Sequence, residues 1–172
     1  CAADSKGDVY AAGVTGSKTN IAINGYQNQM PGVGADSVIY GLYSQREDGF
    51  IVKLNKDGVR QWGTYYGDTS FLDIVNSCTV DKNDNVYIAG VTESNRFIAT
   101  SGSHCDFNNH TTKNFLAKFN TYGTRLWGTY IGNNSVPHNG FVGYDNKGIC
   151  SVDDSNFVYL HGAMADSTMT NI

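Results

Sequence analysis

The amino-acid sequence repeats itself, and the repeat limits what the chain can fold into more than any other feature does. A Cys-x-x-Asp segment begins at residues 1, 78 and 150, so its copies lie 77 and 72 residues apart. The first two copies precede an apolar stretch, Val-Tyr-Ala-Ala-Gly at 9–13 and Val-Tyr-Ile-Ala-Gly at 86–90. A second segment, Lys-Leu-Asn-x-x-Gly at 53–58, returns as Lys-Phe-Asn-x-x-Gly at 118–123. Such repeats predict a fold built from similar units, each packed against its neighbours.

Each unit is predicted to contain four antiparallel strands. In the second unit, strands are expected at 72–81 and 86–91, separated by Asp-Lys-Asn-Asp-Asn, and at 114–120 and 124–131, separated by a turn that closes on Gly123. Asp, Asn and Gly suit the positive φ angles of tight hairpin turns. The aromatic content of 12% also favours strands. Four-stranded units that recur about every 70 residues, with one tryptophan each, are typical of β-propeller blades.

We therefore predict an all-β chain that holds about two and a quarter blades of one propeller. Residues 1–71 are expected to form a partial blade (strands two to four) with a long loop at 16–48. Residues 72–132 are expected to form a complete blade, and residues 133–172 the start of the next. Closed propellers have about 4–8 blades. The remaining blades are expected to come from the same, longer chain, with other copies of the chain as the alternative.

Taken together, the spaced segments resemble the bacterial SBBP-type β-propeller repeats. The resemblance rests on Phe-Ile-Val-Lys-Leu-Asn-x-x-Gly at 50–58, Trp-Gly-Thr-Tyr-x-Gly at 62–67 and Asp-x-x-x-Asn-Val-Tyr-x-x-Gly at 81–90. It implies a part of a large secreted or cell-surface bacterial protein without assigned chemistry. An extracellular or cell-surface location is expected from this resemblance alone.

Residues that recur once per unit are predicted to be structural, because a catalytic residue is expected once in a chain. The tryptophans are predicted to pack between blades. The recurring cysteines are predicted to be buried and free, since equivalent positions on neighbouring blades lie too far apart for a disulfide. The recurring cations, Lys53, Lys118, Arg60 and Arg125, are expected to cover strands with their stems and to reach water or a carboxylate. The tryptophans, cysteines and aspartates predicted to be structural are Trp62, Trp127, Cys1, Cys78, Cys150, Asp4, Asp81 and Asp153.

Three places in the sequence, one loop and two turns, hold residues that could bind a metal. The loop at 104–110 holds soft and borderline metal ligands. Zinc needs about four ligands that converge on one point, and an ordinary polar loop explains the same residues. The oxygen-rich turns at 4–8 and 81–85 could suit calcium, but they lack a closing bidentate Glu, and a hairpin turn explains them equally. We therefore expect no cofactor, with calcium as the alternative. The loop candidates are His104, Cys105, Asp106 and His110.

Charge and motifs restrict the function. A net charge of −4 argues against nucleic acid as a partner. No apolar run is long enough for a transmembrane segment, and neither a nucleophile elbow nor a phosphate-binding loop is present. We predict a non-enzymatic module that binds a protein or glycan at the cell surface, or acts as a spacer. The candidate binding residues are Tyr26, Tyr40 and Tyr43 in the long loop.

The alternative is a part of a propeller enzyme, namely a hydrolase, a lyase or a quinone-dependent dehydrogenase. The Gly-x-x-x-Trp spacing at 58–62 and 123–127 is loosely similar to the blade motif of the quinone-dependent class. Cofactor absorbance would distinguish such an enzyme from a binding module.

Overall fold

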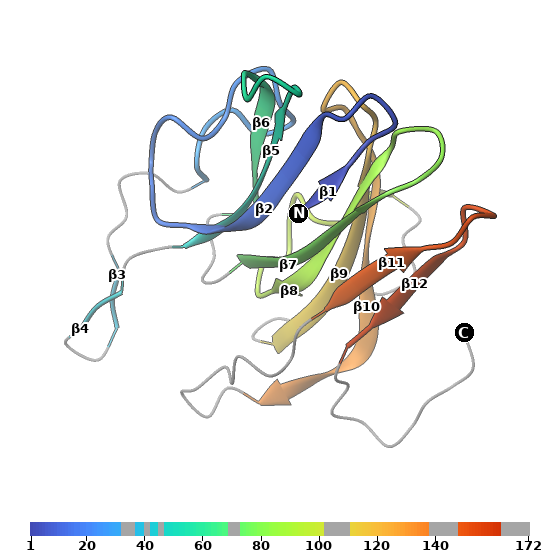
Figure 1. Ribbon diagram of the computed structural model, residues 1–172. Coiled ribbons are helices and arrows are strands. Elements are labelled where there is room, and N and C mark those ends of the chain that lie inside the picture. Colours follow the sequence, from blue (N-terminus) through green and yellow to red (C-terminus); the bar gives the residue numbers. More distant parts are fainter. Residues whose placement is uncertain are drawn as a thin grey trace.

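The fold is all-β, and its strands pair antiparallel in sheets that follow one another along the chain (Figure 1). No helix in the part of the chain that the structure describes has the length and hydrophobicity to span a bilayer. The structure, a computed structural model, describes residues 1–31, 37–39, 42–44, 47–68, 73–101, 111–137 and 148–162.

Two sheets have four strands each, and in both the strand order follows the sequence. The first has the order β1-β2-β5-β6 and the second the order β7-β8-β9-β10. The strands of the first sheet are β1 (Ala2–Ala3), β2 (Val9–Thr15), β5 (Asp48–Leu54) and β6 (Arg60–Tyr66). Those of the second are β7 (Asp73–Val80), β8 (Val86–Thr92), β9 (Thr111–Phe119) and β10 (Arg125–Pro137).

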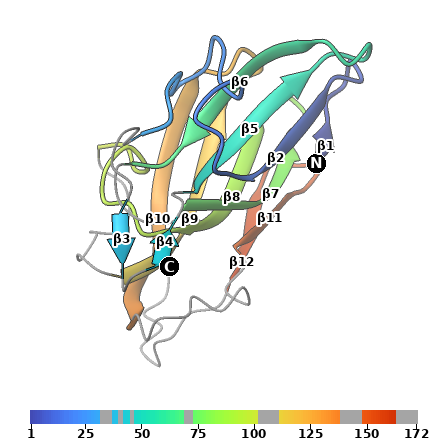
Figure 2. The same ribbon diagram turned by 90° about the vertical axis from the view of Figure 1, so that its left-hand side faces the viewer.

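Two shorter sheets complete the described strands. A two-stranded sheet, called here the half-blade, consists of β11 (Ile149–Val152) and β12 (Val158–His161) and repeats the first hairpin of each larger sheet. A separate hairpin of β3 (Ser37–Ile39) and β4 (Leu42–Ser44) lies within the long connection between β2 and β5. The first sheet, the second sheet and the half-blade lie side by side in chain order, as successive propeller blades do (Figures 1 and 2).

Five tight turns share one geometry because they share one residue pattern. The first residue is Asp or Asn, and its side-chain Oδ1 accepts the backbone N–H groups two and four positions later. The fourth residue has a positive φ, which favours Gly, Asn and Asp. These fourth residues are Gly7, Gly58, Asp84, Gly123 and Asn156, with φ from 60° to 83°.

The main hydrophobic core lies between the first and second sheets. β8 is buried along its whole length, since the first sheet covers one of its faces and the half-blade covers the other. Val86 and Ile88 point into the core shared with the first sheet, and Tyr87 and Ala89 point into the core shared with the half-blade. This alternation follows from the two-residue period of a strand. A central blade strand can therefore read as a continuous apolar run.

The predicted strands agree with these elements, with three differences. The first sheet has a fourth strand, because two residues of β1 pair with β2. β9 begins at Thr111, before the predicted start at 114, and β10 continues to Pro137, past the predicted end of the strand at 131 and of the blade at 132. The third is the short hairpin of β3 and β4, which lies inside the predicted loop at 16–48. Outside the strands, Cys1 was predicted to be buried and is exposed. The thiols of Cys78 and Cys150 lie against carbonyls of the preceding sheet, and none of the described residues forms such a sheet beside β1.

Candidate functional site

The first turn of the first sheet holds a buried carboxylate that binds a lysine. Asp4 Oδ1 accepts the amides of Lys6 and Asp8 at 3.0 and 2.9 Å, and Asp4 Oδ2 lies 2.9 Å from Lys53 Nζ. The same ammonium group lies 3.1 Å from Asp8 Oδ2 and 5.1 Å from the centre of the Tyr10 ring. The sheet register explains the meeting, because Lys53 on β5 lies directly opposite Tyr10 on β2.

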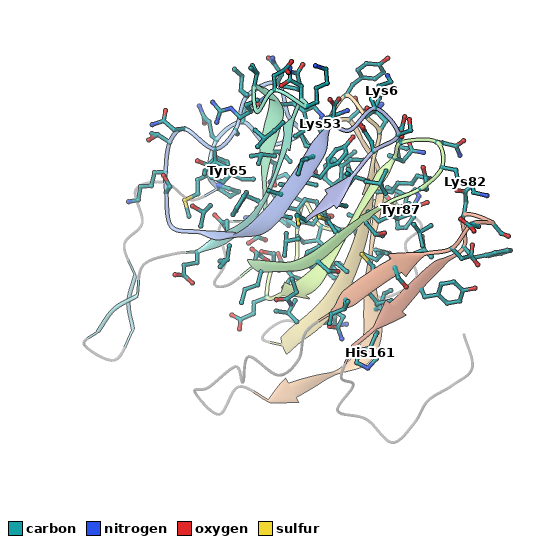
Figure 3. The ribbon with its side chains drawn as sticks, in the orientation of Figure 1. Lys6, Lys53, Tyr65, Lys82, Tyr87 and His161 are labelled. Carbon is teal, nitrogen blue, oxygen red and sulfur yellow. The ribbon has the colours of Figure 1, made fainter. Side chains whose placement is uncertain are left out.

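The second sheet repeats this cluster. Asp81 Oδ2 lies 3.0 Å from Lys118 Nζ, and that ammonium group lies 4.7 Å from the centre of the Tyr87 ring. Lys118 is opposite Tyr87 in the register, and the Tyr87 hydroxyl donates to Asp81 at 3.3 Å. The recurrence supports the expectation that these lysines act within the scaffold. Lys53 and Tyr87 are labelled in Figure 3.

Electrostatics stabilise the charged form of both partners. Burial alone raises the pKa of the Asp4 carboxyl, but hydrogen bonds from Lys53 and from the Asp8 and Lys6 amides outweigh it and lower the pKa. Burial alone lowers the pKa of Lys53, but its hydrogen bonds to Asp4, Tyr10 and Asp8 outweigh it and raise the pKa. A calcium ion at this turn would have to displace the ammonium group of Lys53.

Trp62 joins the first sheet to the second. Its indole N–H donates to the Thr121 carbonyl at 3.0 Å, and its ring stacks on Phe119 with the centroids 6.3 Å apart. Gly123 lies so close that an added Cβ would be 2.8 Å from the indole. Tyr10 meets Trp62 edge-on at 6.0 Å, as Tyr87 meets Trp127 at 5.9 Å in the next repeat. This geometry supports a packing role for both tryptophans.

The recurring arginines hold the chain segment that follows the second strand of each blade. The Arg60 guanidinium donates to the carbonyls of Asn20 and Ile21, and the Arg125 guanidinium donates to those of Phe97 and Ile98. The recipients are again 77 residues apart in the sequence.

The structure does not leave Tyr26 free in an exposed loop, as its predicted binding role requires. Its partly buried ring packs against Tyr66 and Phe119 at the margin of the core between the sheets, with the Arg125 guanidinium 4.1 Å from the ring centre. Tyr26 is therefore held on the neighbouring blade by Arg125 and by the hydrogen bond from its hydroxyl to the Phe97 carbonyl.

A buried polar cluster lies at the opposite end of the sheets, around Asp73 at the start of β7. The Asp73 carboxylate accepts the hydroxyls of Thr92 and Ser94, the latter at 2.6 Å, and the Asp68 amide lies 3.4 Å from it. Burial, with a smaller contribution from the charge of Asp68, raises the pKa of Asp73 to about 7. The side chain has no exposed surface, so the structure gives it no access to a substrate.

The sequence contains a signal for this cluster that the repeat comparison missed. Thr92 and Ser94 correspond to Thr15 and Ser17, and in each pair the serine amide donates to the threonine hydroxyl at 3.0 Å. A tyrosine hydroxyl donates to the serine carbonyl at 2.9 Å in both blades. Thr-x-Ser, which begins at the last residue of the second strand, is therefore a further structural feature of the repeat.

Other predicted site residues fall elsewhere. Cys1, Cys78 and Cys150 are free thiols, as expected, and burial raises the pKa of the last two. The described residues bring together no group of three His, Cys, Asp or Glu side chains suited to a metal. The third recurring carboxylate, Asp153, accepts the Tyr159 hydroxyl at 2.9 Å. Outside the described residues and side chains lie Tyr40, Tyr43, His104, Cys105, Asp106 and His110.

Two comparisons with known proteins bear on this architecture. Residues 61–98 match the model of the SBBP β-propeller repeat. The chain is also 32% identical over 135 residues to an uncharacterized WD repeat-containing protein of Acanthamoeba polyphaga mimivirus. That match covers 74% of this chain and 10% of the viral protein, so the chain spans about a tenth of the relative's length.

The matched repeat begins in the last strand of the first blade and continues past β8, so it includes the hydrogen bond from the Tyr66 hydroxyl to the Ile98 carbonyl, which joins the two blades. The repeat type expected from the sequence is thus supported, although the relative is viral and not bacterial. Together with the stacked four-stranded sheets, these matches show an all-β chain of propeller blades in which residues 61–98 match the SBBP type of repeat.

Proposed function

We propose that these blades form a rigid scaffold that binds a partner protein, and that they carry no catalytic activity of their own. The observation that carries the proposal is the difference between the two ends of the sheets. The tight turns lie at one end and share one geometry. The connections from β2 to β5 and from β8 to β9 leave and return at the other end, and they span 16–47 and 93–110. Connections of unequal length on one side of a repeated scaffold are where binding residues concentrate.

The contacts of the recurring charged residues also support a scaffold. Lys53 and Lys118 pair with turn aspartates, and Arg60 and Arg125 hold backbone carbonyls. These contacts stabilise each blade and its connection.

A replacement variant tests the proposed function. Residues 32–46 are replaced by a short Gly-Ser linker, which leaves the arginine-held segment and β5 in place. The control is Tyr122→Ser, at an exposed residue of a tight turn. The wild type and the control should capture the same partner proteins from the native host, and their binding should be confirmed with purified components. The linker variant should not bind these proteins. Retention by the linker variant, or a catalytic turnover that Asp73→Asn abolishes, would contradict the proposal.

We further propose that the module works outside the cell or at its surface, which rests on the resemblance of its repeats to those of exported proteins. Protease treatment of intact cells should degrade it. A glycan array distinguishes a sugar ligand from the proposed protein partner.

A further inference from the structure

The connection from β8 to β9 has an exposed tip near its start, formed by Asn95, Arg96 and Phe97. The Arg96 side chain is 61% exposed and Phe97 is 49% exposed. The residues on either side of the tip, Ser94 and Ile98, are completely buried. The tip therefore projects from the blade, while the chain enters and leaves it in the interior.

Hydrogen bonds hold both ends of the tip in place. The Ser94 hydroxyl donates to the Asp73 carboxylate at 2.6 Å, and the Ser94 carbonyl accepts the Tyr130 hydroxyl at 2.9 Å. On the other side, the Ile98 carbonyl accepts the Tyr66 hydroxyl at 2.7 Å. A segment fixed in this way loses little conformational freedom when it binds a partner, and this preorganisation favours affinity.

Phe97 adopts a backbone conformation that does not suit its side chain. Its φ is 65°, in the left-handed region that bulky residues rarely occupy. The residue at the equivalent position of the first blade, 77 residues earlier, is Asn20, which has a φ of 66°. Asn tolerates this region, so the repeat imposes the conformation and Phe97 occupies it with backbone strain. Strained residues of this kind concentrate at functional sites.

Packing inside the protein does not explain the choice of phenylalanine. The Phe97 ring belongs to neither hydrophobic core cluster. It stays exposed although the first blade contacts this residue, since the Tyr26 hydroxyl donates to the Phe97 carbonyl at 3.3 Å. Asn20, in turn, is exposed although the second blade follows it. Within the described part of the chain, neither a preceding nor a following blade covers this position of the repeat.

Arg96 places a cation beside the exposed ring. Its guanidinium lies 5.8 Å from the centre of the Phe97 ring, and its Nε lies 3.8 Å from Oδ2 of the buried Asp68. The Arg96 amide donates to the same oxygen at 3.1 Å, which orients the residue. A guanidinium has five N–H donors, so it can contact Asp68 and also bind a carboxylate from outside. Because Arg96 is the charged residue of the tip, the charge that complements the tip is negative.

We propose that the tip at 95–97 binds an acidic, apolar segment of a partner protein. Phe97 packs among apolar side chains of that segment, and the Arg96 guanidinium pairs with an Asp or Glu beside them. Aromatic and arginine side chains are enriched among the residues that contribute most to binding at protein interfaces. This inference rests on the proposed function and names the residues of the β8–β9 connection that carry it.

The test selects ligands for the purified chain from a phage-displayed library of short random peptides. The enriched peptides should carry Asp or Glu next to apolar residues. Phe97→Asn should weaken the binding of a synthetic copy of an enriched peptide about tenfold or more. Arg96→Gln, or an amide in place of the peptide's carboxylate, should each weaken it about tenfold, and the two together should weaken it no further. The control Tyr122→Ser, which removes an exposed aromatic ring from a tight turn, should leave the affinity unchanged.

Urea unfolding separates a binding role of Phe97 from a structural one. Phe97→Asn gives the second blade the residue that the first blade has at this position, so the unfolding midpoint should not fall. The inference is overturned if the library yields no saturable ligand, if the ligands are insensitive to Phe97→Asn and Arg96→Gln, or if Phe97→Asn lowers the midpoint. A partner protein captured equally by the wild type and by Phe97→Asn would also overturn it, while leaving the proposed function in place. If the wild type captures no partner protein, the proposed function fails and this inference fails with it.

Discussion

The buried Asp73 makes the stability of the protein depend on pH in an unusual direction. Its carboxyl has no exposed surface, and burial raises its pKa from 3.8 to about 7. The folded state therefore holds this proton more tightly than the unfolded state does. Below about pH 4 both states are protonated and no penalty arises. As the pH rises from about 4 to 7, the unfolded state ionises first, so folding stability falls.

The size of the effect follows from the difference in pKa. About three pKa units at 1.36 kcal/mol each give up to about 4 kcal/mol of stability lost between pH 4 and pH 8. Asp73→Asn removes the ionisation and keeps the shape of the side chain. Its amide can still pair with the hydroxyls of Thr92 and Ser94, since one hydroxyl then accepts where it had donated. The variant should match the wild type near pH 4 and exceed its stability by about 2–4 kcal/mol at pH 8.

Urea unfolding at pH 4, 5, 6, 7 and 8, followed by tryptophan fluorescence, measures this difference. Asp57→Asn, which removes an exposed carboxylate, controls for the change in net charge. Because both proteins share all other titrating groups, the gap between their stability curves isolates Asp73. A gap that stays constant with pH, or a variant less stable than the wild type at pH 8, would refute the reasoning.

Five further substitutions test the contacts between and within blades by urea unfolding. Gly58→Ala and Gly123→Ala introduce similar backbone strain, because both glycines have a positive φ, but only Gly123 lies against the indole of Trp62. We therefore expect Gly58→Ala to lower the free energy of unfolding by about 1 kcal/mol and Gly123→Ala to lower it by about 3 kcal/mol. Equal losses would argue against that close contact. Lys53→Met leaves two carboxylates without their cation and should cost about 3 kcal/mol, whereas Lys118→Met, at a more exposed pair, should cost about 1. Trp62→Ala should lower the free energy of unfolding by about 3–5 kcal/mol, and a decrease below about 1 kcal/mol would contradict the position of Trp62 in the core.

Much of the fold could be predicted from the sequence because each strand appears more than once. The turn at 81–85 could be predicted from its Asp and Asn residues, and the two strands that it joins could be predicted from the two-residue alternation of side chains along a strand. The packing role of Trp62 was predicted from its recurrence, and the structure provides the contacts.

Other features depended on contacts between blades, which no single repeat contains. Tyr26 was predicted to be exposed because the long loop looked like an insertion, but Arg125 from the next blade covers its ring. Cys1 was predicted to be buried because Cys150 has the same local sequence, yet the cover over Cys150 comes from Tyr87 and Ser77 of the preceding sheet. The polar cluster at Asp73 was missed because it joins three separate segments, and only Thr-x-Ser among them recurs.

The central claim is that the first and second sheets stack as successive blades through Trp62 and Gly123, and NMR tests it most directly. One Gly123 Hα lies where a Cβ would be 2.8 Å from the indole, so the ring current should shift its resonance strongly upfield. Gly58, with nothing near the same position, provides the reference. The account predicts an upfield Gly123 Hα with NOEs to the Trp62 ring, and a Gly58 Hα in the ordinary range. Ordinary shifts for both glycines, without those NOEs, would contradict blade stacking.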